Sequence, residues 1–194
     1  MRLEAEVIRD TLLKSAGLLS TKMYGPGVRP PQPTGVTDGA WEASAGEDRH
    51  RRTLYTFQKR TFPFAMTTTF DGPTGESCLA RRDVSNSAMQ ALTLLNDPMF
   101  LEVAQGLAKV AVAAASDDGS RLREISRRVL SRDLDAEETA VLLVFLGQQR
   151  QRLAAGQLDA AKLAGPGAGD TVERAAWMLV ARAVMNLDEA IVKR

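Results

Sequence analysis

Apolar residues recur at helical spacing through the second half of the chain, and this pattern constrains the fold more than any other feature. The clearest run comprises Phe100, Val103, Ala104, Leu107, Val110 and Ala111. Intervals of three and four residues place these side chains on one face of an α-helix. Pro98 suits the first turn of this helix, and Asp97 can cap it.

Five further segments predict helices, over residues 3–19, 85–96, 120–131, 135–153 and 170–186. Ser85 or Asn86 can cap the second of these, with Met89, Leu92 and Leu95 on one face. Asp135 and Glu138 have the spacing of a capping box. Asp170 follows the glycine-rich break at 165–169 and can cap the last long helix, after which a short tail helix is expected.

Residues 20–46 are rich in glycine, proline, threonine and serine, and they predict a long loop. The prolines at its centre favour an extended, polyproline-like path over residues 29–33. A loop of this length is uncommon in a compact domain unless it is functional or packed. We expect it to wrap around the domain, anchored by Val28, Val36 and Trp41.

Residues 53–57 have high β-propensity, and either a short strand or a helical turn is open to them. Residues 62–75 carry two prolines and two glycines and predict irregular structure. The sequence thus predicts a mainly α, irregular helical domain of about six helices, with a long Pro/Gly-rich wrapping loop and at most a short strand. We expect a single domain over 1–194, largely irregular at 20–84 and helical at 85–194.

Charge and cysteine content limit the classes of partner. The net charge is +1, which argues against bulk attraction to nucleic acid or to a membrane. With one cysteine, Cys78, the chain forms no internal disulfide framework. No signal peptide and no membrane span are recognisable. The chain enters a helix within its first residues, so we expect it to be a fragment of a longer protein.

An arginine-rich and aromatic segment, residues 49–97, is the best candidate for a binding site. Guanidinium groups bind carboxylates, phosphates and sulfates, and aromatic rings stack on sugars and bases. The candidate ligand-binding residues are Arg29, Arg52, Tyr55, Lys59, Arg60, Arg81 and Arg82. A structural interpretation is preferred, in which the arginines of the segment pair with Asp71, Glu76, Asp83 and Asp97 and hold irregular backbone against the helices.

No known catalytic motif identifies a reaction, and catalytic residues remain unknown. His50, the single histidine, is flanked by arginines and is more typical of a structural or surface residue than of a base. Cys78 is expected to be buried and unreactive, and Met89 and Met99 are expected in the core. No metal ligand set and no haem attachment motif is found, so we expect no cofactor in this chain.

Several strings together resemble a known family. They are RPPQPTGV, GEDRHRRTLYTFQKRT, the TFD of residues 69–71, ESCLARRDVSNSAMQALTLLNDPMFLEVAQGLA and the closing WMLVARAVMNLDEAIVKR. They resemble the planctomycete cytochrome-associated carboxy-terminal domain, the domain of unknown function fifteen-fifty-three. Gln58 departs from the pattern, because a tryptophan is frequent there, and Gly75 replaces a frequent arginine.

This resemblance implies the end of a large exported, extracytoplasmic (periplasmic) protein. Its partners would be an upstream cytochrome-type module, which would carry haem, and a planctomycete-specific domain. We therefore expect a structural or interaction module. The alternative is a glycan- or anion-binding surface of a polysaccharide-linked redox enzyme. RNA binding through the same arginines is the weaker third interpretation because the net charge is near zero.

Overall fold

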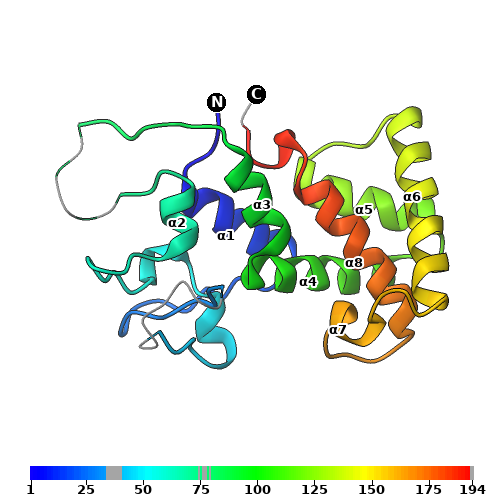
Figure 1. Ribbon diagram of the computed structural model, residues 1–194, viewed down its shortest axis with the longest axis horizontal. Helices are drawn as coiled ribbons and strands as arrows, with labels where there is room; N and C mark the ends of the chain where they lie inside the picture. The colour runs from blue at the N-terminus through cyan, green and yellow to red at the C-terminus, as the bar shows by residue number, and fades with distance from the viewer. Residues whose placement is uncertain (34–40, 74, 76–77, 79, 193–194) are drawn as a thin grey trace. The chain divides into compact units, whose positions relative to one another are not determined.

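The computed structural model of the chain is mainly helical (Figure 1). It describes residues 1–33, 41–73, 75, 78 and 80–192. Within these ranges it contains eight α-helices, six of them of seven residues or more, and no strand. The predicted mainly α fold with about six substantial helices is confirmed.

The chain divides into two compact units. Unit 1 comprises residues 1–14, 18–101 and 191–194, and unit 2 comprises residues 15–17 and 102–190. Unit 1 is therefore assembled from three separate stretches of the chain. The expectation of one domain over 1–194 concerns independent folding, and it stays a prediction.

In unit 1, helix α1 (Ala5–Ser15) supplies one side of the core. Its Ile8, Leu12 and Leu13 are buried, as the helical spacing requires. The helix ends before Gly17, whose φ of 70° is a left-handed conformation that glycine adopts without strain. The Leu18 N–H then donates to the Leu13 carbonyl at 2.9 Å, which closes the helix end.

The long loop after α1 is packed along the segment that follows it in sequence. Isolated parallel bridges join Ser20 to Arg51 and Val28 to Thr56. Val28 is buried, and Trp41 stacks on Phe64 at a ring separation of 6.1 Å. Two of the three predicted anchors are therefore in place, and Val36 lies outside the described residues.

Two 3-10 helices, η1 (Gly46–His50) and η2 (Thr53–Tyr55), occupy the start of the arginine-rich segment. Of the two structures open to residues 53–57, the helical turn is the one observed. The irregular structure expected over 62–75 is wrong in part, because helix α2 (Ala65–Thr69) lies there. Burial explains the helix: Phe64, Met66 and Phe70 are all in the core, and this gain outweighs the weak helix propensity of three consecutive threonines.

Helix α3 (Ala88–Asn96) begins after Ser87, so neither Ser85 nor Asn86 is its N-cap. The expectation of Met89 in the core is also wrong, since Met89 is 63% exposed, and Leu92 on the same face is 50% exposed. Gln90 is buried instead, and its amide donates to the Thr69 carbonyl at 3.1 Å and to Ser85 Oγ at 3.0 Å. Gln90, with its amide nitrogen hydrogen-bonded, takes an inward position on this helix in place of Met89.

Helix α4 (Pro98–Ala114) confirms the strongest sequence signal. Met99 donates its N–H to Asp97 Oδ1 at 2.9 Å, so Asp97 caps the helix as predicted. Met99 and Phe100 are fully buried in unit 1. Val103 and Leu107, further along the helix, are fully buried in unit 2.

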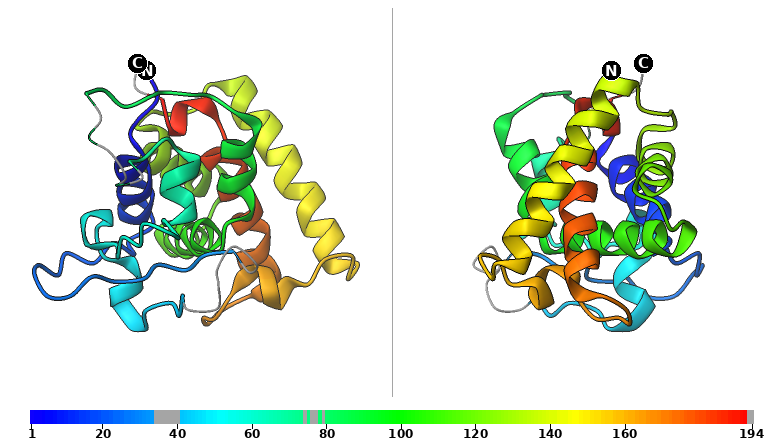
Figure 2. Two further views of the ribbon diagram at one scale, coloured as in Figure 1. Left: turned by 60° about the vertical axis from the view of Figure 1, so that its left-hand side comes forward. Right: turned by 90° about the vertical axis from the view of Figure 1, so that its right-hand side faces the viewer.

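Unit 2 is a helical assembly around α8 (Thr171–Met185), which contacts α5 (Asp118–Leu130), α6 (Ala136–Ala154) and α7 (Ala160–Ala164). Helices α6 and α8 run side by side in both views of Figure 2. Asp170 caps α8, and the complete capping box of Asp135 and Glu138 opens α6. The short helix α7 was not predicted, and the expected tail helix is the 3-10 turn η3 (Asp188–Ala190).

A charged network stabilises unit 2 around Glu173 of α8. Arg121 donates to its carboxylate at 2.7 Å, Arg150 at 2.6 Å and the Trp177 indole at 2.8 Å. Arg150 also donates to both oxygens of Asp118 at 2.6 and 2.7 Å. Partial burial raises the pKa of Glu173, but the hydrogen bonds from Arg150 and Trp177 outweigh it and leave this pKa below its usual value.

Candidate functional site

Two buried arginines organise the irregular half of unit 1. Arg9 of α1 is fully buried, and its guanidinium donates to the carbonyls of Arg51 at 2.7 Å and Arg49 at 3.0 Å and to Thr53 Oγ1 at 3.2 Å. Burial lowers the pKa of Arg9 to about 10, against the opposing effect of Asp10. Arg9 therefore remains a cation at neutral pH and satisfies carbonyls that irregular backbone leaves unpaired.

Arg51 likewise donates hydrogen bonds to main-chain carbonyls, in this case those of the loop that precedes it. Its guanidinium donates to the carbonyls of Tyr24 at 2.5 Å and Pro26 at 3.3 Å, and it lies over the Tyr55 ring at 3.9 Å. Only 1% of Arg51 is exposed. A buried cation with its donors on carbonyls and its plane on an aromatic ring holds backbone in place and leaves little surface for a ligand.

Asp10 fixes the turn η2 from the other side. Its Oδ1 accepts from the Thr53 N–H at 2.8 Å and from Thr53 Oγ1 at 2.7 Å. Its Oδ2 lies 3.8 Å from Arg52 Nε. The carboxylate thus positions Arg52, half of whose side chain is exposed, at the end of the turn.

Some of the seven predicted ligand-binding residues make contacts within unit 1. Arg82 donates to both carboxylate oxygens of Glu6, at 2.9 and 3.1 Å, and this pairing raises its pKa. Arg29 lies over the Phe57 ring at 4.8 Å, and Lys59 lies 5.7 Å from the Phe62 ring centre. These contacts are those of side chains that stabilise their own fold.

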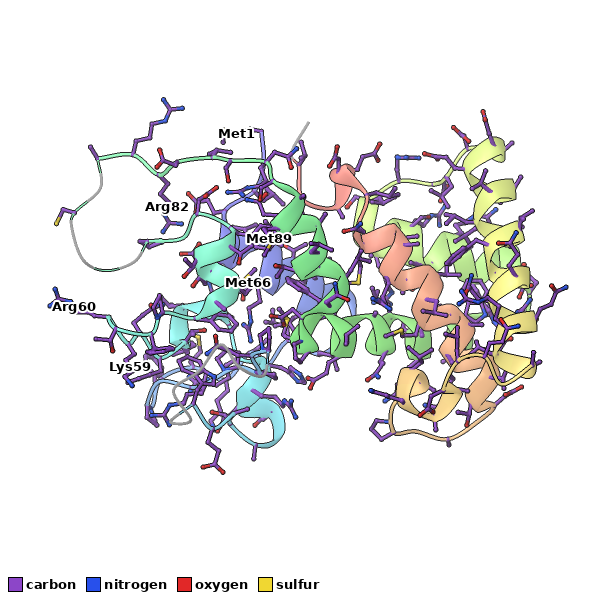
Figure 3. All side chains as sticks on the ribbon, in the orientation of Figure 1. Met1, Lys59, Arg60, Met66, Arg82 and Met89 are labelled. Atoms are coloured by element: carbon purple, nitrogen blue, oxygen red, sulfur yellow. The ribbon has the colours of Figure 1, made fainter. Side chains whose placement is uncertain are left out.

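Other members of the predicted set are more available. Arg60 and Arg81 are exposed, and neither forms a hydrogen bond or ion pair with another residue of the described ranges. Tyr55, in contrast, is engaged, because its hydroxyl accepts from the Tyr24 N–H at 3.1 Å and Arg51 lies over its ring. Figure 3 shows Lys59 and Arg60 apart from Arg82, so the set does not converge on one point.

The ion pairs observed differ from those that the structural interpretation of the arginines expected. Arg82 pairs with Glu6 and with Glu4 at 3.4 Å, and Asp71 pairs with Arg2 at 2.7 Å. The pairing expected of Glu76 falls on a residue outside the described ranges. Two exposed residues also correct the expectations: Cys78 is exposed and not buried, and Met89 lies outside the core.

A groove with a volume of about 620 Å³ lies beside α1 in unit 1. We call it the α1 groove. Its lining side chains include Glu4, Glu6, Val7, Asp10, Lys14, Arg52, Leu54, Thr56 and Gln58. Arg52 is thus the one residue of the predicted set that lines it.

A smaller hollow of about 300 Å³ lies at Arg81 and Arg82. It is lined also by Arg2, Phe70 and Asp71. Partial burial raises the pKa of the Asp71 carboxyl, but hydrogen bonds from Ser85 and Arg2 outweigh it and leave this pKa below its usual value. The charges of this hollow are therefore largely paired inside the unit.

The structure adds three observations on chemistry. Within the described ranges, no group of three or more histidine, cysteine, aspartate or glutamate side chains is arranged to hold a metal ion. None of the described helices combines the length and the apolar character needed to cross a membrane. His50 lies in η1 and is partly exposed.

Arg9 and the α1 groove were missed from the sequence. Arg9 had one visible signal, since it stands between Ile8 and Leu12 within the apolar stripe of α1. A cation in such a stripe is buried only when carbonyls or carboxylates meet it. The groove had no such signal, because its two walls are far apart in sequence.

Comparison with known proteins gives one match. No curated protein and no solved structure matches the chain. The family model described as PSD1, protein of unknown function (DUF1553), matches residues 1–146. This match confirms the family resemblance for the strings within residues 1–146, and the closing string at 177–194 lies outside the matched residues. The chain belongs to the PSD1 family of proteins of unknown function (DUF1553).

Proposed function

We propose that the chain is a non-catalytic helical module that packs against other domains of a larger, exported, cytochrome-c-linked protein. The observation that carries the proposal is the internal use of the arginine-rich segment. Arg51 is buried on carbonyls and Tyr55, and Arg82 is paired with Glu6. Arginine side chains that bind groups of their own unit stabilise the module, as a structural role requires.

Exposed apolar side chains support the interaction part of the proposal. Met89 and Leu92 lie one turn apart on α3 and are 63% and 50% exposed, and Val84 nearby in sequence is 51% exposed. Neighbouring apolar side chains on a surface favour packing against another protein surface. The upstream cytochrome-type domain, the extracytoplasmic location and the haem it would carry rest on the family resemblance.

The arginine pair Arg81 and Arg82 tests the structural role. Arg82→Ala removes two hydrogen bonds to Glu6 and should lower the melting temperature by a few degrees, whereas the matched variant Arg81→Ala should leave it unchanged. Unchanged stability in Arg82→Ala together with lost binding of a sulfated oligosaccharide would contradict the proposal.

Oxidation of methionines tests the packing role. Brief treatment with hydrogen peroxide should oxidise Met89 in the isolated chain and spare the buried Met99, as read by peptide mass spectrometry. In the full product of the gene, a covering domain should protect Met89. Equal oxidation of Met89 in both forms would count against packing through α3.

A second function, a glycan- or anion-binding surface of a polysaccharide-linked redox enzyme, is favoured by the α1 groove. Its volume of about 620 Å³ falls in the usual range for ligand sites, roughly 300–1,000 Å³. The exposed Arg52 contributes a donor at its edge. Calorimetry with neutral and sulfated oligosaccharides tests this function, and the absence of heat with both at millimolar concentration would exclude it.

A further inference from the structure

We propose that the α1 groove binds a neutral, polyhydroxylated ligand, a short uncharged oligosaccharide segment. The inference rests on the second proposed function and names the ligand class. It also places the site between α1 and residues 52–58, where Arg52 is the one member of the predicted ligand-binding set. The charge, hydrogen-bonding groups and apolar surface of the groove each support it.

Most of the charges that line the groove are paired, and Lys14 is the lining residue for which the described part of the chain gives no ion pair. Asp10 lies 3.6 Å from Arg9 and 3.8 Å from Arg52, and Glu6 and Glu4 lie 2.9 and 3.4 Å from Arg82. An anionic ligand would gain from Lys14 but would approach the three carboxylates of Glu4, Glu6 and Asp10, whose neighbouring arginines already form ion pairs. A cationic ligand would compete with arginines that are held in place. A neutral ligand meets neither penalty.

Hydrogen-bonding capacity in the groove is not used up by the protein. Thr56 is 94% buried, and its hydroxyl has no hydrogen-bond partner among the described residues. Rotation about χ1 exchanges this hydroxyl with the methyl group of the same side chain. Gln58 is exposed and makes no hydrogen bond within the described part of the chain. Sugar hydroxyls both donate and accept, so they match a hydroxyl and an amide together.

The groove also exposes apolar side chains to solvent. Leu54 is 73% exposed and Val7 is 43% exposed, and both line the groove. The C–H faces of a sugar ring can cover such side chains while its hydroxyls remain at the polar groups. Aliphatic surface beside a few placed polar groups is the usual composition of small-ligand sites.

Calorimetry of the full chain with a neutral tetrasaccharide series and sulfated counterparts tests the inference. We expect the neutral sugars to bind and the sulfated ones to bind more weakly or not at all. Thr56→Val removes the hydroxyl at constant shape and should weaken binding about fivefold, the effect of one lost hydrogen bond. Gln58→Ala and Leu54→Ser, both at exposed positions, should weaken it as well.

Stability measurements keep these variants interpretable. Thr56→Val relieves a buried, unpaired hydroxyl, so its melting temperature should be unchanged or higher while binding falls. Arg81→Ala, outside the groove, is the matched control and should bind like the unmodified chain. Neutral binding that survives in Thr56→Val, Gln58→Ala and Leu54→Ser would overturn the placement in the groove.

The remaining outcomes separate the inference from the function on which it rests. Tighter binding of sulfated sugars, lost in Arg81→Ala, would overturn the neutral ligand class and leave a binding surface in place. Equal binding of a neutral tetrapeptide would also overturn the ligand class. No heat with any sugar would overturn both.

Discussion

Arg9 donates to the main-chain carbonyl of Arg51 at 2.7 Å, so one buried arginine holds the backbone of another. The two guanidinium groups bind different segments. Arg9 donates hydrogen bonds to the segment 49–53, and Arg51 donates to the carbonyls of Tyr24 and Pro26. Together they attach two irregular segments to α1. An irregular fold of this kind depends on a few side chains that satisfy many backbone groups.

Substitution of Arg51 should therefore be costly. Arg51→Ala leaves two carbonyls without their donors and removes the stack on Tyr55, and we expect a loss of roughly 2–4 kcal/mol in the free energy of unfolding. Arg52→Ala, next in sequence but half exposed, should cost less than about 1 kcal/mol. Urea unfolding monitored by circular dichroism measures both, and equal losses would contradict the assignment.

Glu173 should be the most sensitive carboxylate of unit 2. Glu173→Gln keeps the shape but removes the charge that Arg121 and Arg150 share, and it should cost about 2 kcal/mol. Glu124→Gln breaks an exposed pair with Arg128 on one helix and should cost less than about 0.5 kcal/mol. Thermal unfolding of the two variants gives the comparison, and a smaller effect for Glu173 would refute the role of the network.

Asp71 should make unit 1 sensitive to acid. Its pKa is below the usual value in the folded state, so its stabilising contribution is fully present above the unfolded pKa of about 3.9 and is lost as the pH falls through the folded pKa. Asp71→Asn should cost about 2 kcal/mol at neutral pH and progressively less below about pH 4. A difference between the two proteins that stays constant with pH would rule out this linkage. Asparagine tolerates the positive φ of 56° at this position, so backbone strain does not confuse the comparison.

The capping box of α6 gives a local prediction. Asp135→Ala frees the Glu138 N–H, which Asp135 Oδ1 accepts at 2.8 Å, and should lower the free energy of unfolding by about 1 kcal/mol. Glu137→Ala, in the same first turn but outside the box, should have less than half of this effect. Chemical denaturation of both variants checks the prediction, and an equal effect would attribute it to helix-end charge alone.

The sequence predicted elements that are determined locally. The capping box at Asp135, the cap at Asp97 and the buried stripe of α8 all depend on residues within one or two turns. Helix α2 was missed because its formation depends on burial of Phe64 and Met66. The three consecutive threonines have low helix propensity, so the local sequence does not predict a helix there. The expectation that Met89 of α3 is buried was wrong. Gln90 is buried instead, because it donates hydrogen bonds to Thr69 of α2 and to Ser85 before α3.

In the candidate site, too, local features could be predicted from the sequence and tertiary contacts could not. Arginines and aromatic residues mark their segment by composition, but composition does not reveal which guanidinium is buried. Arg51 is buried and Arg52 is exposed, although they are adjacent. Gln58, noted as a departure from the family pattern, lines the α1 groove, and only the fold brings it beside α1. Tertiary contacts between distant segments decide such points, and a single sequence does not encode them in a local pattern.

The three-part composition of unit 1 has a consequence for how the protein is made. The Leu3 N–H donates to the Ile191 carbonyl at 2.7 Å, and an isolated bridge joins Arg2 to Val192. All four residues belong to unit 1, so its contacts are complete only after residue 192 has left the ribosome. Unit 2 extends to residue 190, so both units reach their full set of contacts only when almost all of the described chain has been synthesised. During synthesis, the first hundred residues of unit 1 are thus made long before the segment that completes their contacts.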